Sequence, residues 1–195
     1  MAALCGRGAS TVTAFEFVFP LFGLLVGLSF AEMLSGLARA LKTKRDVHVG
    51  WLTPLLGTLI LINLTMFWQG AWEVRDVGAP TSVSLLLILA VGGGYFLAAS
   101  MVFPSPGDEV RDLDTHFMDN RGVALLAIAG CNLLYLVLIA AAAAQRLSAA
   151  WWIGNALFLA LLLVAALARG KRLVRAILVA LISAHGLMMV LGQAR

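Results

Sequence analysis

The sequence predicts an all-α, polytopic membrane helix bundle with six transmembrane helices and a short cytoplasmic interfacial helix, on three observations. Hydrophobic residues make up 62% of the 195 positions and charged residues only 12%, whereas a soluble globular chain is about 45–50% apolar and about 25% charged. Six apolar stretches are long enough to cross a bilayer, and basic residues gather in alternate loops between them. This composition excludes a soluble enzyme, a disordered chain and a nucleic-acid-binding domain.

A spanning helix needs about 20 mostly apolar residues. Because the bilayer core offers no water, each backbone N–H and C=O must be satisfied within the segment, so these stretches are expected to be helices. Glu16 interrupts the first stretch and no small-residue cleavage site follows it, so we expect a retained helix and not a signal peptide. The chain is predicted to form a single transmembrane domain, 1–195, with spans at about 15–38, 51–72, 82–103, 123–144, 150–168 and 173–193.

The distribution of basic residues predicts the orientation. Ten lie in loops one, three and five: Arg39, Lys42, Lys44, Arg45, Arg111, Arg121, Arg169, Lys171, Arg172 and Arg175. Four lie on the other side: Arg7, Arg75, Arg146 and Arg195. The positive-inside rule therefore places the three basic loops in the cytoplasm and both termini outside. The net charge of +4 follows from this topology and requires no nucleic-acid partner.

Tryptophans gather near the predicted helix ends, where an indole with an apolar body and one N–H donor anchors at the membrane interface. These residues are Trp51, Trp68, Trp72, Trp151 and Trp152.

The first predicted helix carries a small residue at every fourth position, which forms a ridge on one face. Small residues allow two helix backbones to approach closely in a bilayer. The pattern indicates tight helix packing but does not distinguish packing within one chain from packing between chains. We favour packing within the chain. The ridge consists of Gly23, Gly27, Ala31 and Ser35.

Polar residues within the predicted spans form a candidate intramembrane site. An intramembrane carboxylate such as Glu32 is costly unless paired or hydrated, which indicates either a functional role or an ion pair with Arg39, two turns away on the same face. Gly92, Gly93 and Gly94 permit either a helix break, as at transporter sites, or a close helix contact. Asn63, Asn132 and His185 lie near mid-depth and either line a site or bond across helices.

The third cytoplasmic loop is the longest, and its apolar residues at helical spacing predict a short amphipathic helix at the interface. Its acidic residues are expected to dock between the two flanking basic loops. They include Asp108, Glu109, Asp112 and Asp114. No metal site is predicted, because Asp112 and His116 share a helix face whereas Asp114 points away.

Other chemistry finds little support in the sequence. Bis-His haem ligation needs a second intramembrane histidine beside His185, so no cofactor is predicted. Ion-coupled pumps usually use buried carboxylates, and none is expected at mid-depth. No nucleophile–base or metal-binding motif of an intramembrane protease is present.

Several stretches resemble a group of uncharacterised bacterial inner-membrane proteins. They are GLLVGLSFAEMLSGLARAL, HVGWLTPLLGTLILINLTMFWQGAW, and GGYFLAASMVFP with DLDTHFMDNRG. The similarity covers about the first two-thirds of the chain and implies a multi-span protein of a bacterial inner membrane. It implies no activity and no catalytic residue.

We therefore expect a non-catalytic membrane protein that acts as an accessory or assembly component through helix packing. Its partners are the lipid bilayer and other membrane subunits or a second copy. The alternative is a channel or carrier for a small neutral or apolar compound, and the third possibility is a lipid-modifying enzyme. A polar cavity at mid-depth would favour transport, whereas a packed midplane would favour the accessory role.

Overall fold

The computed structural model describes residues 14–42, 50–73, 81–104, 112–143 and 147–192. Within these ranges the chain forms six α-helices and no strand. They are α1 (Ala14–Lys42), α2 (Leu52–Glu73), α3 (Ser82–Val102), α4 (Leu113–Ala143), α5 (Ala149–Leu167) and α6 (Lys171–Gly192). The predicted all-α helix bundle is confirmed.

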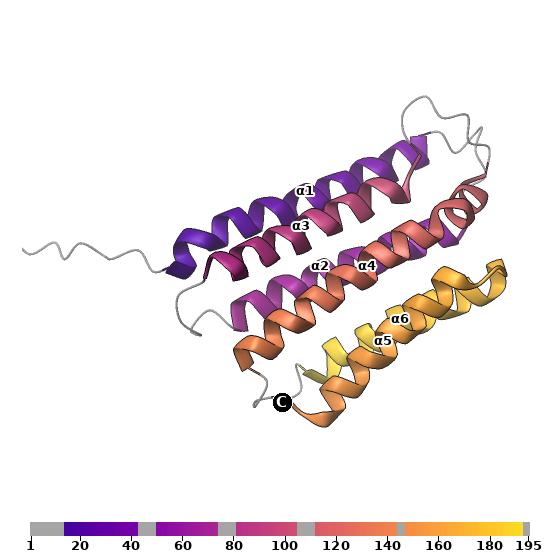
Figure 1. The fold of residues 1–195 in the computed structure, drawn as a ribbon. Helices are drawn as coiled ribbons and strands as arrows, with labels where there is room; N and C mark the ends of the chain where they lie inside the picture. Colours follow the sequence, from indigo (N-terminus) through magenta and orange to yellow (C-terminus); the bar gives the residue numbers. More distant parts are fainter. Residues whose placement is uncertain (1–13, 43–49, 74–80, 105–111, 144–146, 193–195) are drawn as a thin grey trace, which may run out of the picture.

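Successive helices run in opposite directions and pair into three layers (Figure 1). Helix α1 packs along α3, α2 lies beside α4, and α5 lies beside α6. The layers contact each other because α3 packs on α4, α5 on α4, and α6 on α2. Helix α2 also contacts α1 and α3, and half of its span is buried, the largest share among the spans.

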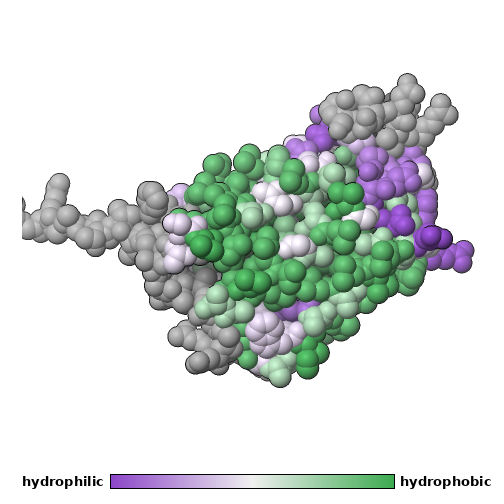
Figure 2. Space-filling model, in the orientation of Figure 1, coloured by the Kyte–Doolittle hydropathy of each residue, from purple (hydrophilic) through white to green (hydrophobic). Residues whose placement is uncertain are grey.

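Five helices, α1 to α5, are long and apolar enough among the described residues to cross a membrane. On the face shown in Figure 2, apolar side chains cover most of the lateral surface, and polar side chains gather toward one end of the bundle. Large exposed side chains on this surface include Leu24, Leu86 and Leu157, each about 60% exposed or more. Because such a surface is solvated by lipid and not by water, the chain is an integral membrane protein with several spans.

Two helix starts show how local sequence sets the boundaries. Ser148 caps α5, since its hydroxyl accepts a hydrogen bond from the N–H of Trp151 at 3.2 Å. Asp112 acts in the same way at α4, where its Oδ1 accepts from the N–H of Asp114 at 3.2 Å. Helix α5 ends where Ala168 becomes extended.

One feature differs from the prediction. The segment expected to form a separate interfacial helix is, from Leu113 onward, the first part of α4, which continues through the predicted fourth span. The helix is continuous through the polar residues before the apolar span, and two of their side chains bond to helix carbonyls. Asn120 donates to the carbonyl of His116 at 3.1 Å, and Arg121 donates to that of Met118.

Candidate functional site

A buried polar cluster joins α2, α3 and α4. The Nδ2 of Asn132 lies 3.0 Å from Tyr95 Oη, 3.4 Å from Asn63 Oδ1 and 2.9 Å from the carbonyl oxygen of Ile128. Asn63 in turn donates its Nδ2 to the carbonyl of Leu59 at 2.9 Å. Tyr95, Asn63 and Asn132 are all buried, so these amide and hydroxyl groups satisfy one another where no water reaches them.

The cluster contains one residue that the sequence prediction missed. Tyr95 follows the glycine run directly and is only 2% exposed. Its hydroxyl supplies the acceptor that connects α3 to the Asn63–Asn132 pair. The available signal was a phenol inside an apolar span, since a tyrosine hydroxyl buried in a protein usually finds a hydrogen-bond partner.

The glycine run does not break α3, which is continuous from Ser82 to Val102. Instead the glycines provide room for neighbours. A Cβ on Gly92 would come within 2.8 Å of the Leu25 side chain of α1, and one on Gly94 would clash with the Cys131 sulfur of α4. Gly93 has open space around it. Of the two alternatives, the structure therefore shows close helix contact.

Two residues of the predicted polar site lie elsewhere. Glu32 pairs with Arg39 along α1, with 3.3 Å between Oε1 and Nη2, and both side chains are partly exposed. On α6, His185 donates its Nδ1 proton to the carbonyl of Leu181 at 2.9 Å, and its ring packs edge-on against Phe158. The structure thus brings together Asn63, Asn132 and Gly94, but neither Glu32 nor His185.

The small-residue ridge of α1 contributes little to packing within the chain. Only Gly23 meets a neighbouring helix closely, because its Cβ position lies 3.3 Å from the Trp68 ring of α2. Gly27 has no atom within 4 Å of its Cβ position, and Ala31 and Ser35 are exposed. The buried face of α1 is a different one, formed by Phe22, Val26, Ser29, Met33 and Gly36.

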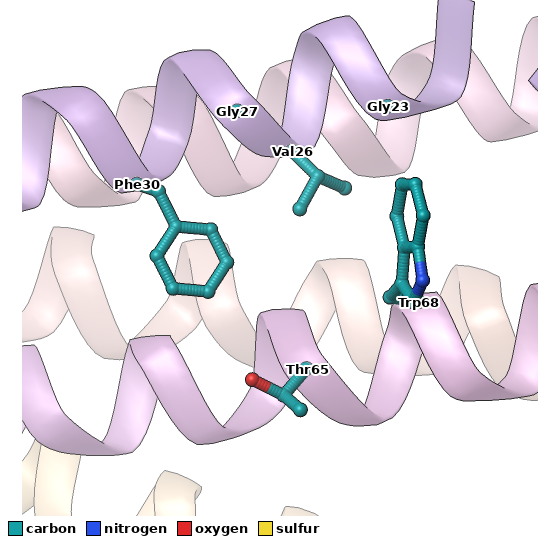
Figure 3. A pocket seen from close by; sticks show the side chains of 6 residues that line it. All are labelled: Gly23, Val26, Gly27, Phe30, Thr65 and Trp68. Carbon is teal, nitrogen blue, oxygen red and sulfur yellow. The ribbon is translucent and has the colours of Figure 1, made fainter. Parts of the chain in front are cut away.

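A shallow groove of about 360 Å³ lies beside this ridge, between α1 and α2 (Figure 3). The rings of Phe30 and Trp68 stand at its two ends, and Thr65 lies on the α2 side. The Thr65 hydroxyl donates its proton to the carbonyl of Leu61 at 2.9 Å, so the lining is almost entirely apolar. The groove is lined by Gly23, Val26, Gly27, Phe30, Thr65 and Trp68.

At the polar end of the bundle, the acidic residues of α4 contact two other helices. Asp114 Oδ1 accepts a hydrogen bond from the backbone N–H of Leu52 at 2.9 Å, which caps the start of α2. Beside it, Thr53 donates its hydroxyl to the carbonyl of Leu113 at 3.2 Å. The predicted docking partners were the basic loops, whereas Asp114 docks on a helix terminus. Asp108 and Glu109 lie outside the described residues.

Asp112 makes the ionic contact at this end. Its Oδ2 lies 3.3 Å from Lys171 Nζ at the start of α6 and also accepts from the Thr115 hydroxyl. These contacts, with the Thr115 hydrogen bond as the largest cause, hold the pKa of the Asp112 carboxyl below its usual value. The expected attraction between the acidic segment and the fifth loop is therefore present in this pair.

Among the described residues, no group of three His, Cys, Asp or Glu side chains is arranged to hold a metal ion. No protein-family model matches the chain, and no curated protein or solved structure matches it either.

Proposed function

We propose that this integral membrane protein has a non-catalytic role and acts as an accessory or assembly component of a membrane complex, with α1 facing the partner. The exposed small-residue face carries this proposal. Gly27, Ala31 and Ser35 leave the α1 backbone accessible in a surface otherwise rich in Leu, and the apolar groove continues that face toward α2. A helix backbone that is open to lipid suits close approach by another helix.

The packing at mid-depth supports the accessory role over the alternative channel or carrier. A carrier for a neutral compound would use the amides of Asn63 and Asn132 for its substrate. Here they bond to one another, to Tyr95 and to helix carbonyls. Binding a substrate would require these bonds to open and the three helices to separate.

We further propose that the protein lies in a bacterial inner membrane. The resemblance of its sequence to bacterial inner-membrane proteins supports this location. Helix α6 is proposed as the sixth span, because its 22 residues would extend about 33 Å and it lies antiparallel to α5. Both termini would then lie outside the cytoplasm. A reporter enzyme that is active only outside the cytoplasm, fused after Arg195, should be active.

The functional test is purification of the full chain from its native membrane in a mild detergent. We expect a partner in fixed stoichiometry, either another subunit or a second copy of this chain. Gly27→Leu should lower its recovery at least about tenfold, since a bulky side chain blocks close helix approach.

Gly130→Leu is the matched control, because Gly130 on α4 is also exposed and also has open space at its Cβ position. It should leave the partner bound. A wild-type chain that is monomeric and carries no partner would refute the proposed role. Equal loss of the partner in both variants would refute the assignment to α1.

A further inference from the structure

The turn between α5 and α6 displays arginines on a fixed scaffold. Arg121 of α4 donates its Nε proton to the carbonyl of Ala168 at 2.8 Å, which fixes the end of α5. On the other side of the turn, three residues after Ala168, Lys171 Nζ contacts Asp112 Oδ2 at 3.3 Å and Thr115 Oγ1 at 3.1 Å. Both sides of the short turn are therefore tied to α4.

The cations that remain are exposed. Arg169 lies within the turn, and Arg172 and Arg175 follow on the first turns of α6, three residues apart and thus on neighbouring positions of one face. In the part of the chain that the structure describes, none of these three arginines has an ion-pair partner. Asp112, the carboxylate that contacts this end of α6, is paired with Lys171.

Exposed apolar side chains lie close to these arginines along the chain. Leu167 at the end of α5 is 80% exposed, and Leu173 on α6 is about half exposed. A group that binds here therefore meets positive charge at the bundle end and hydrocarbon-compatible surface below it. A phospholipid with an anionic headgroup and acyl chains has this arrangement of charge and apolar surface.

We propose that Arg169, Arg172 and Arg175 form a docking surface for the headgroups of acidic phospholipids. The guanidinium fork suits the phosphate oxygens, and the excess of positive charge favours a lipid with net negative charge over a zwitterionic one. The Arg121 and Lys171 contacts hold the turn in place, so little ordering is needed when the lipid binds. This assignment is independent of the partner role of α1.

The test uses the full chain in an uncharged detergent, mixed with equal amounts of dioleoyl phosphatidylglycerol and dioleoyl phosphatidylcholine. Native mass spectrometry then counts each bound lipid. We expect the phosphatidylglycerol adducts to exceed the phosphatidylcholine adducts about tenfold. Raising the salt concentration before detergent exchange should reduce this ratio for the wild-type chain, because the attraction is electrostatic.

In the variant R169Q/R172Q/R175Q the ratio should fall to within about twofold. In R169K/R172K/R175K, which keeps the charge, most of the preference should remain. The matched control is K42Q/K44Q/R45Q, which removes the same charge after α1 and should keep the ratio near the wild-type value. Equal numbers of adducts of the two lipids on the wild-type chain would overturn the proposal. An acidic protein segment would then be the better candidate for binding these arginines. An equal loss in the control would also overturn it, because the site would then be unspecific.

Discussion

The carboxylate of Asp114 accepts a hydrogen bond from the backbone N–H of Leu52 at 2.9 Å, across 62 positions of sequence. The first N–H groups of a helix have no partner within that helix, and its N-terminus carries partial positive charge. An aspartate on α4 therefore caps α2. Gly50 makes the contact possible, because a Cβ at that position would overlap the Asp114 carboxylate. At the polar end of the bundle, α4 is therefore linked to α2 by this cap, and the Asp112–Lys171 ion pair links the start of α4 to α6.

Removing this cap should destabilise the bundle. Asp114→Ala is expected to lower the free energy of unfolding by about 1 kcal/mol, the usual cost of losing an N-cap. Thermal unfolding in detergent measures the effect. Asp119→Ala is the control, because Asp119 is an exposed carboxylate on the same helix. The same loss in both variants would mean that general charge, and not the cap, stabilises this end.

The contact between Gly50 and Asp114 predicts a non-additive pair of substitutions. Gly50→Ala alone should destabilise the bundle by about 1–3 kcal/mol, since the new methyl group displaces the carboxylate. In the Asp114→Ala background the same substitution should cost much less, because the overlapping group is gone. Unfolding measurements on all four proteins complete the cycle. Additive costs would contradict the proposed overlap.

The sequence was sufficient to predict the helices, because the length of an apolar stretch decides a span and needs no tertiary information. It was less informative at the start of α4. Asp119 and Arg121 mark the edge of the apolar stretch, but α4 does not end there. These two residues lie at the polar end of the bundle, where Arg121 bonds to the carbonyls of Met118 and Ala168. Such contacts depend on where α5 ends in space.

For the candidate site, sequence identified polar residues but not which of them meet. Asn63 and Asn132 are within hydrogen-bond reach of each other, whereas His185, predicted at a similar depth, faces Phe158. The depth of a residue in the membrane can be obtained by counting along its helix. The direction in which its side chain points depends on how the helix is rotated about its axis, and packing against other helices determines that rotation. The same limit applies to α1, where Gly36, directly after the predicted ridge, makes the close contact with Phe103.

The buried cluster predicts a specific cost for Asn132. Asn132→Leu should destabilise the bundle by about 0.6 kcal/mol and by no more than about 1.7 kcal/mol, the average and the maximum for hydrogen bonds between membrane helices, because it leaves Tyr95 and Asn63 without this donor. Asn155→Leu is the control, since the Asn155 amide bonds only to the Trp151 carbonyl of its own helix in the described contacts. Thermal unfolding in detergent should separate the two. A larger cost for Asn155→Leu would contradict a role for the cluster in joining α2, α3 and α4.

The Asp112 contacts predict a pH dependence in the acidic range. Because the pKa of Asp112 is lowered in the folded protein, its contribution is present above the unfolded pKa of about 3.9 and is lost as pH falls through the lower folded pKa. The midpoint of thermal unfolding should therefore fall more steeply below about pH 4 in the wild type than in Asp112→Asn. The effect should be small because the pair is partly exposed, and high salt should weaken it. Parallel curves for the two proteins would exclude a contribution from this carboxylate.

Gly27 and Gly36 lie on opposite sides of α1, and the same substitution should have opposite effects at the two positions. Gly36→Ala should destabilise the bundle by about 1–3 kcal/mol, since its methyl group would overlap the Phe103 ring at the end of α3. Gly27→Ala should leave stability unchanged or raise it by up to about 1 kcal/mol, because its Cβ position is open and alanine favours a helix. Thermal unfolding of both variants checks the sign. In Gly36→Ala/Phe103→Leu the smaller side chain should relieve part of the cost. A destabilising Gly27→Ala in a chain shown to be monomeric would mean that this side of α1 is packed within the bundle, against the open surface on which the partner role depends.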